Sequence, residues 1–375
     1  MSYKLVNHIP QFNFQINRIL TYGEIACDEK EVIEASSKIK TLKEWNKSWR
    51  LIAEKAVSEN RFFHAAYYYR MAEFFLKETD AHKDLIYNLC ILNFYKAFDE
   101  CKLPYKRYDV PFEQGILNCI KITAKEEKGV VLICGGYDSF IEEFVLTVSK
   151  LEELGYTVIL FEGPGQGKSL KQQLYFIYDW ERPTSTVIDY FHIYKCAMIG
   201  ISWGGYLALR SAAFEKRITA VVAYDVMYNG FEVMTNIFPS FIKKVVRWLY
   251  HNDRKSMLNL LIKLLRRKSI MADWALSQGM YITGTHDSYN FYKELSKHTL
   301  KNICNKIDQD VLLLAGEKDH YIPVEQYDQL RVQIHNDRSL TCRLFTNAEG
   351  GEQHCQIGNH MLAINEIIKW LDQVI

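Results

Sequence analysis

The first third of the chain carries apolar residues at helical spacing. From Ile33 to Ala56, from Phe63 to Leu76 and from Leu85 to Phe98, apolar side chains recur at steps of three and four residues, the period of one face of an α-helix. Proline is absent between Pro10 and Pro104, which suits uninterrupted helices. The pattern predicts that residues 1–108 form a helical segment, rich enough in aromatic residues to serve as a lid over the next domain or as an oligomer surface.

From about residue 109 the pattern changes to short apolar runs that alternate with amphipathic stretches. The runs predict strands at 116–123, 130–134, 156–161, 196–201, 218–224, 311–315 and 341–346. Short, continuously apolar runs are typical of strands buried on both faces of a parallel sheet. Such strands in alternation with helices predict an α/β fold with a mainly parallel, doubly wound sheet.

Residues 229–299 interrupt this alternation with helical patterns alone. A helical insertion after a sheet strand, at the end where ligands collect, is typical of a cap domain, and the alternative is a set of core helices on one face of the sheet. The predicted organisation is a helical segment at 1–108, a first core part at 109–228, the cap at 229–299 and a second core part at 300–375.

Ser202 lies at a predicted sharp turn between a buried strand and a helix. The sequence Gly200-Ile201-Ser202-Trp203-Gly204 has the G-x-S-x-G spacing of a nucleophile elbow, in which the residues two before and two after the serine must be small. Free N–H groups at the start of the following helix favour a developing oxyanion beside the hydroxyl. Ser202 is therefore the candidate nucleophile, and the alternative is an ordinary strand-to-helix turn.

A serine nucleophile needs a base and an acid that orients the base, and in this kind of fold the chain order is serine, acid, histidine. Asp319 follows the predicted strand at 311–315, and His354 lies on a glycine-rich loop after the predicted strand at 341–346. These two residues are the candidate acid and base. The alternatives that stay open are Glu317 and Asp225 for the acid and His360 and His320 for the base.

The oxyanion hole is predicted from two backbone N–H groups: that of Trp203, directly after the nucleophile, and that of Tyr137, on a glycine-rich loop after an early strand. The phenol of Tyr137 is a further candidate donor. The later stretch Gly163-Pro164-Gly165-Gln166-Gly167-Lys168-Ser169 ends like a phosphate-binding loop, but such a loop requires glycine where Glu162 stands. We interpret this stretch as a tight turn near the site.

Composition and charge exclude several other classes of protein. The formal net charge is +1, which gives no sign of a nucleic-acid partner. The nine cysteines include no C-x-x-C pair, which indicates a reducing compartment and no metal site. No signal-peptide pattern and no apolar run of membrane-spanning length occurs. We therefore expect a cytoplasmic protein without a cofactor, a bound metal or a membrane partner.

Several short motifs occur in the order seen in α/β-hydrolases. They are Gly-Gly-Tyr-Asp, Glu-Gly-Pro-Gly-Gln-Gly-Lys-Ser, Gly-Ile-Ser-Trp-Gly-Gly, Gly-Glu-Lys-Asp and Glu-Gln-His-Cys, within about residues 110–375. The chain resembles the branch with an N-terminal helical segment, which includes acylaminoacyl-peptidase-like, dipeptidyl-peptidase-like and dihydroxypseudooxynicotine-hydrolase-like enzymes. The resemblance implies a triad of Ser202, Asp319 and His354, an oxyanion hole at Tyr137 and Trp203, and a homodimer formed through the helical segment.

The function predicted from these features is hydrolysis of an ester or amide through an acyl-enzyme on Ser202. Carbon–carbon cleavage of a diketone-like substrate is one alternative, and a non-catalytic binding module of the same fold is another. The expected substrate is a small acyl compound or a short peptide-like compound in an enclosed, partly apolar pocket. The aromatic residues that favour such a pocket are Trp45, Trp49, Tyr67–Tyr69, Trp274 and Tyr281.

Overall fold

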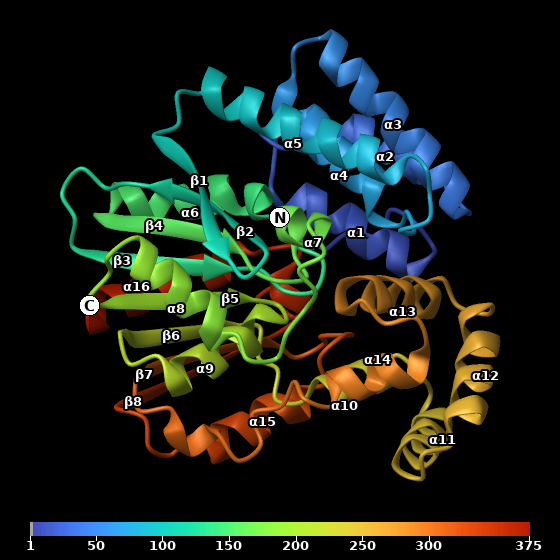
Figure 1. Ribbon diagram of the computed structural model, residues 1–375. Coiled ribbons are helices and arrows are strands. Elements are labelled where there is room, and N and C mark those ends of the chain that lie inside the picture. The colour runs from blue at the N-terminus through green and yellow to red at the C-terminus, as the bar shows by residue number, and fades with distance from the viewer. Residues whose placement is uncertain (1–2) are drawn as a thin grey trace. The chain divides into compact units, whose positions relative to one another are not determined.

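A computed structural model describes residues 3–375, which divide into two compact units (Figure 1). Unit 1 holds the residues up to Pro104 together with Ile357–His360, and unit 2 holds Tyr105–Gln356 and Met361–Ile375. The short returning stretch is tied into unit 1 by the backbone N–H of Gly358, which donates to the hydroxyl of Thr21 at 2.8 Å. The chain therefore leaves unit 2 directly after Gln356 and re-enters it at Met361.

Unit 1 is helical, as the N-terminal pattern predicted, although the apolar run from Ile33 to Ala56 is divided between two helices and residues 105–108 belong to a strand. Its helices are α1 (Pro10–Thr21), α2 (Glu29–Ser36), α3 (Leu42–Ser58), α4 (Phe62–Phe74) and α5 (Lys83–Glu100). The start of α3 is fixed by a capping box, in which the Thr41 hydroxyl accepts from the Glu44 N–H and the Glu44 carboxylate accepts from the Thr41 N–H.

The tryptophans of α3 form part of the core of unit 1. Trp45 and Trp49 are fully buried, and their ring centroids lie 5.5 Å apart. The Trp45 ring also lies 4.7 Å from Phe12, and its indole N–H donates to the Met71 carbonyl at 2.6 Å. The expectation that these two tryptophans favour a substrate pocket is therefore wrong, because their aromatic surface and the Trp45 indole N–H are used inside unit 1.

Unit 2 is built on a sheet with the strand order β1-β2-β4-β3-β5-β6-β7-β8. Its strands are β1 (Tyr105–Phe112), β2 (Gly115–Ile122), β3 (Gly129–Cys134), β4 (Tyr156–Glu162), β5 (Cys196–Ile201), β6 (Ile218–Tyr224), β7 (Asp310–Gly316) and β8 (Ser339–Phe345). Strand β2 is antiparallel to both of its neighbours, and the pairs from β4 to β8 are parallel. The mainly parallel α/β fold predicted from the sequence is confirmed.

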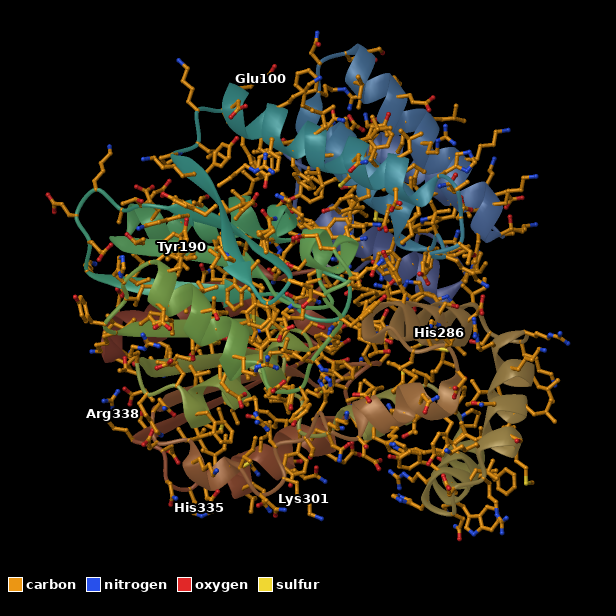
Figure 2. All side chains as sticks on the ribbon, viewed as in Figure 1. Glu100, Tyr190, His286, Lys301, His335 and Arg338 are labelled. Atoms are coloured by element: carbon orange, nitrogen blue, oxygen red, sulfur yellow. The ribbon has the colours of Figure 1, made fainter. Side chains whose placement is uncertain are left out.

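Helices cover both faces of this sheet, and side chains fill the spaces between the ribbons (Figures 1 and 2). In the view of Figure 1, α8 and α9 lie in front of the strands, and α6 and α16 lie behind them. The bounds of the helices outside the cap are α6 (Val145–Glu153), α7 (Gly167–Lys171), α8 (Glu181–Tyr190), α9 (Gly204–Phe214), α15 (Val324–Gln333) and α16 (Met361–Val374), with 3₁₀ turns at Ile141–Phe144, Cys304–Lys306 and His354–Gln356.

Five helices stand between β6 and β7, in the insertion predicted to be a cap. They are α10 (Gly230–Asn236), α11 (Ser240–His251), α12 (Lys255–Arg266), α13 (Ile270–Thr283) and α14 (Ser288–Leu295). Helix α12 packs against α11, α13 and α14, and α10 packs against α11 and α14. These helices pack against one another, as a predicted cap would, and the assignment as a cap stays a prediction. Among the helices of residues 3–375, none combines the length and the apolar composition that crossing a bilayer requires.

Candidate active site

Ser202 occupies a constrained turn between β5 and α9. Its φ angle is +64°, in the left-handed region that residues with a side chain rarely adopt. A Cβ atom at Gly200 would collide with the carbonyl oxygen of Gly204, and one at Gly204 would lie 2.8 Å from the carbonyl oxygen of Gly135. The small residues of the predicted elbow are therefore required by close backbone approaches on both sides of the serine.

The structure brings Ser202, His354 and Asp319 together in one hydrogen-bonded chain. The hydroxyl of Ser202 lies 2.9 Å from Nε2 of His354, and Nδ1 of the same ring lies 2.6 Å from Oδ2 of Asp319. The other oxygen of Asp319 accepts the backbone N–H groups of Tyr321 and Ile322 at 2.8 and 2.9 Å. The carboxylate is thus held by its own loop while it faces the imidazole, as the chain order of these residues predicted.

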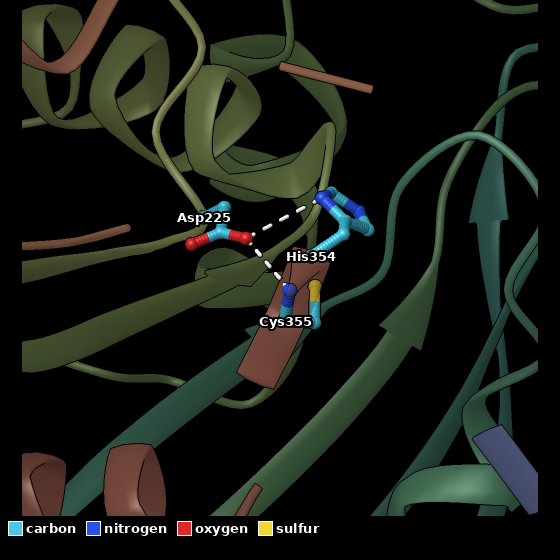
Figure 3. Close-up of side chains that lie close together, drawn as sticks. All are labelled: Asp225, His354 and Cys355. Atoms are coloured by element: carbon cyan, nitrogen blue, oxygen red, sulfur yellow. Dashed lines mark hydrogen bonds and ion pairs between the residues drawn. The ribbon is translucent and has the colours of Figure 1, made fainter. Parts of the chain in front are cut away.

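Asp225 is a second buried carboxyl group beside this histidine (Figure 3). It directly follows β6, and its Oδ2 lies 3.3 Å from Nδ1 of His354. The same oxygen accepts the backbone N–H of Cys355 at 2.7 Å, and the phenol of Tyr224 donates to the Cys355 carbonyl at 2.9 Å. The end of β6 therefore holds the backbone of Cys355, the residue after the histidine, while Asp319 makes the shorter contact with the imidazole ring.

The ionisation of these three groups is coupled by burial and by short distances. Burial opposes the charged form of His354, but the neighbouring charge of Asp319 raises the pKa of the imidazole well above its usual value. Burial also opposes ionisation of Asp319, yet the charge of His354 lowers the pKa of this carboxyl group. Burial and then the charge of Asp319 raise the pKa of Asp225 to about 8. These opposite shifts favour ionisation of Asp319 over ionisation of Asp225.

The other candidates for acid and base have different surroundings. Glu317 is exposed, and its carboxylate accepts the backbone N–H of Asn347 at 2.7 Å. The ring of His320 lies 3.9 Å from that of Tyr321, and burial lowers the pKa of His320 to about 4. His360 belongs to unit 1, where its ring lies 5.7 Å from that of Tyr22. The imidazole that meets the serine hydroxyl is that of His354.

Two backbone N–H groups beside Ser202 are available for an oxyanion. A Cβ atom at Gly136 would lie 2.6 Å from the backbone nitrogen of Trp203, so the loop after β3 runs directly against the start of α9. Neither the Tyr137 N–H nor the Trp203 N–H donates to another residue that the structure describes. The phenol of Tyr137 is already used, because it donates to the Ala275 carbonyl of α13 at 2.6 Å.

Gln166 supports this loop in a way that the sequence did not indicate. Its carboxamide nitrogen donates to the carbonyl oxygens of Gly135 and Gly136 at 2.8 and 3.0 Å, and its carboxamide oxygen accepts the Gly163 N–H at 3.1 Å. The glycine-rich stretch after β4, interpreted above as a turn near the site, therefore carries a side chain that fixes where the peptide groups after β3 point. The only feature of the sequence that pointed to this stretch was its position directly after a predicted strand.

The indole of Trp203 is held by a second residue that no sequence pattern singled out. Its N–H donates to Nδ1 of His298 at 3.2 Å, and the backbone carbonyl of His298 accepts the Gly230 N–H at 2.8 Å. Burial lowers the pKa of His298 to about 3, so the ring is neutral and its Nδ1 is an acceptor. Trp203 is thus anchored to the segment that follows α14.

One group of potential metal ligands lies in the same place. Ligand atoms of Asp225, His354 and Cys355 lie within 4.8 Å of one another (Figure 3). The imidazole nitrogen of this group already faces Asp319 at 2.6 Å, and the Asp225 oxygen accepts a backbone N–H. Burial also raises the pKa of the Cys355 thiol, which disfavours the thiolate that a metal needs. The contacts therefore fit hydrogen bonding within the protein better than metal binding.

The chain belongs to the α/β-hydrolase fold family. The family model described as alpha/beta hydrolase fold matches residues 130–348, more than half of the chain, and this span runs from β3 to beyond β8. The protein is a hydrolase of this family.

Relatives match the chain over nearly its whole length. It is 25% identical to the hydrolase LUC6 of Fusarium sp, 25% identical to the 20-hydroxy-prefusarin hydrolase FUS2 of Gibberella moniliformis and 26% identical to the hydrolyase poxO of Penicillium oxalicum, each alignment covering 96% of both chains. Among solved structures, the 2,6-dihydroxy-pseudo-oxynicotine hydrolase superposes with a TM-score of 0.70 at 17% identity, covering 96% of this chain and 95% of that one. This likeness extends the shared fold across the N-terminal helices.

Proposed function

We propose that this hydrolase cleaves an ester or amide through a covalent acyl-enzyme on Ser202. The observation that carries the proposal is the chain of short contacts from the Ser202 hydroxyl through His354 to Asp319, at 2.9 and 2.6 Å. A hydroxyl that is hydrogen-bonded to an imidazole, itself oriented by a carboxylate, is the arrangement that makes serine nucleophilic. The relatives named as hydrolases are consistent with this chemistry.

In the proposed reaction, Oγ of Ser202 forms a bond to the substrate carbonyl carbon, and its proton passes to Nε2 of His354. The N–H groups of Tyr137 and Trp203 stabilise the negative charge that develops on the carbonyl oxygen. The tetrahedral intermediate collapses as His354 returns the proton to the leaving alcohol or amine, which leaves an acyl group on Ser202. Water then attacks this ester with His354 as base, and the carboxylic acid departs with Ser202 restored.

The substrate is proposed to be a small acyl compound or a short peptide-like compound. Helix α13 contributes Ala275 to the contact with Tyr137, and the ring of Trp274 lies 6.4 Å from that of Tyr137. Aromatic and apolar groups thus stand next to the peptide groups that would bind the oxyanion, which favours a partly apolar acyl group.

The test is active-site labelling with a fluorophosphonate probe, followed by mass mapping of the modified peptide. Labelling is expected at Ser202 and is expected to disappear in Ser202→Ala. In His354→Ala the labelling rate should fall by about 10⁴-fold or more, because the hydroxyl loses its base. His335→Ala is the matched control, because this histidine is exposed and its Nδ1 lies 2.8 Å from the Gln333 carbonyl, in a different contact from that of His354.

Two results would count against the proposal. A folded wild-type protein that is not labelled would favour a binding module of the same fold. Labelling at Ser202 without turnover of any ester or amide, but with turnover of diketones, would move the reaction to carbon–carbon cleavage. A panel of acyl esters, anilides and diketones, compared with the Ser202→Ala variant as blank, separates these outcomes.

A further inference from the structure

Helices α11 and α12 of the cap expose apolar residues opposite their packed faces. On α11, Phe241 and Trp248 are 74% and 55% exposed. On α12 the exposed apolar residues follow at spacings of three and four positions: Met257, Leu260 and Leu264. The buried residues of the two helices lie on other faces: Val246 and Leu249 on α11, and Leu258 and Ile262 on α12. Each helix is therefore apolar on two sides, and packing within the chain explains one of them.

The same stretch has a strong excess of positive charge. Residues 240–268 contain nine Lys or Arg and one acidic residue, Asp253, so this stretch carries a formal charge of +8 in a chain whose total is +1. Lys244 stands between Phe241 and Trp248, three residues after the first and four before the second. This spacing places its exposed side chain on the same face of α11 as the two aromatic rings.

The cations beside the exposed leucines of α12 are exposed as well. Lys263 follows Leu260 by three residues, and Arg267 follows Leu264 by three. Lys244, Lys263 and Arg267 form no ion pair with another described residue. The ion pairs of this stretch use other cations: Lys243 and Arg247 with Glu232, and Arg266 with Asp273. The exposed face of each helix thus combines large apolar side chains with uncompensated positive charge.

The charge of this face decides between possible partners. A second copy of the chain docked through the same face would bring Lys244, Lys263 and Arg267 against their own equivalents, which is unfavourable for a symmetric contact. An anionic lipid surface offers phosphate groups for the cations and an apolar boundary layer for Phe, Trp and Leu. Amphipathic helices with Lys and Arg beside such residues lie in that boundary.

We propose that α11 and α12 form a docking surface for membranes containing anionic lipids. This departs from the expectation of no membrane partner, which depended on the lack of a spanning segment. A helix that lies in the interface needs no such segment, because only one face enters the lipid. The proposal is independent of the reaction proposed for Ser202, since binding to lipid is measured without turnover.

The experiment is co-sedimentation of the full chain with two kinds of vesicle, one of phosphatidylcholine and one of equal parts phosphatidylcholine and phosphatidylglycerol. Binding is expected to the anionic vesicles, to weaken as salt is raised and to be much weaker on the neutral vesicles. The triple variant Lys244→Glu, Lys263→Glu, Arg267→Glu should bind at least about tenfold more weakly, since three cations that attract anionic lipid are replaced by carboxylates that repel it. The double variant Trp248→Ser, Leu260→Ser should also lose binding.

Matched controls change the same properties elsewhere in unit 2. The triple variant Lys125→Glu, Lys301→Glu, Lys369→Glu alters net charge equally at exposed positions, and Tyr194→Ser with Val332→Ser removes exposed apolar groups. Both should bind as the wild type does. Absence of binding, equal binding to neutral vesicles, or equal losses in the controls would overturn the proposal. So would a dimer in sedimentation equilibrium that the Trp248→Ser, Leu260→Ser variant dissociates, because the face would then be an interface between copies.

Discussion

Asp225 and Asp319 face the same imidazole nitrogen, Nδ1 of His354, from the ends of the adjacent strands β6 and β7, at 3.3 and 2.6 Å. Two carboxyl groups so close to each other do not ionise equally, because the charge on one disfavours charge on the other. The shorter contact and the backbone N–H groups around Asp319 favour its ionised form over that of Asp225. The pair can therefore act as one carboxylate and one neutral hydrogen-bonding group.

The first prediction concerns the pH dependence of the reaction. In the proposed reaction His354 must be neutral to accept the serine proton, and its pKa lies above the usual value because of Asp319. The rate of fluorophosphonate labelling should therefore rise with pH along a limb centred above about 6.5. Asp319→Asn removes the charge that raises this pKa, so the limb should move to lower pH while the maximal rate falls by about 10⁴-fold.

The control for this prediction is Glu317→Gln, because Glu317 is an exposed carboxylate on the same loop with a different partner. It should leave both the limb and the maximum unchanged. A wild-type limb centred at or below about 6.5 would contradict the assignment of a raised pKa to His354.

The second prediction separates the two carboxyl groups. Asp225→Asn has the shape of the neutral acid and keeps an oxygen for the Cys355 N–H, so labelling below pH 8 should stay within a few-fold of the wild type. Asp225→Ala leaves that N–H without its acceptor and should lower the free energy of unfolding by about 1–3 kcal/mol. Urea denaturation measures the second effect. If Asp225→Asn were as inactive as Asp319→Asn, Asp225 would be the acting acid.

The third prediction concerns the contacts of Gln166 with the loop after β3, which carries the Tyr137 N–H proposed to bind the oxyanion. Gln166→Glu replaces the donor to the Gly135 and Gly136 carbonyls by an acceptor, so these peptide groups should shift. Loss of one oxyanion donor costs about 10²–10³ in rate, and a decrease of labelling approaching that size is expected. Gln172→Glu is the matched control, since its carboxamide donates to the Lys168 carbonyl, away from this loop. Equal rates for wild type and Gln166→Glu would refute a positioning role.

The fourth prediction tests whether the Tyr137 phenol acts directly. Because the phenol is bound to the Ala275 carbonyl, Tyr137→Phe should lower the free energy of unfolding by about 0.5–1.5 kcal/mol and leave labelling nearly unchanged. Tyr206→Phe, which removes a phenol contact to the Tyr178 carbonyl, provides the stability comparison. A loss of labelling of about 10²-fold in Tyr137→Phe alone would instead make the phenol an oxyanion donor.

Some features of this fold are local in the sequence, and others are not. The central strands were predictable because a strand buried on both faces is continuously apolar. The edge strand β1 was not, because its residues are largely polar or exposed and include Pro111, which an edge strand tolerates. Trp45 and Trp49 were misjudged because aromatic residues have the same helical spacing in a unit's own core as on a binding surface.

The candidate site divides in the same way. Ser202, Asp319 and His354 could be predicted because a glycine-flanked turn and the chain order of three residue types carry the signal. The contact of Gln166 with the Gly135 carbonyl and that of His298 with the Trp203 indole join positions far apart in the chain. Such pairs depend on the folded arrangement, and no local pattern marks them.

The return of Ile357–His360 to unit 1 has a consequence for the order in which the protein matures. Domains released from the ribosome usually fold from the N-terminus onward. Here the partner of Thr21 is Gly358, a residue synthesised after every strand of the sheet. The contacts of unit 1 are therefore completed only after residues 357–360 have been synthesised. A protein cut after Pro104 would lack this stretch, and supplying 357–360 as a peptide should raise its thermal stability.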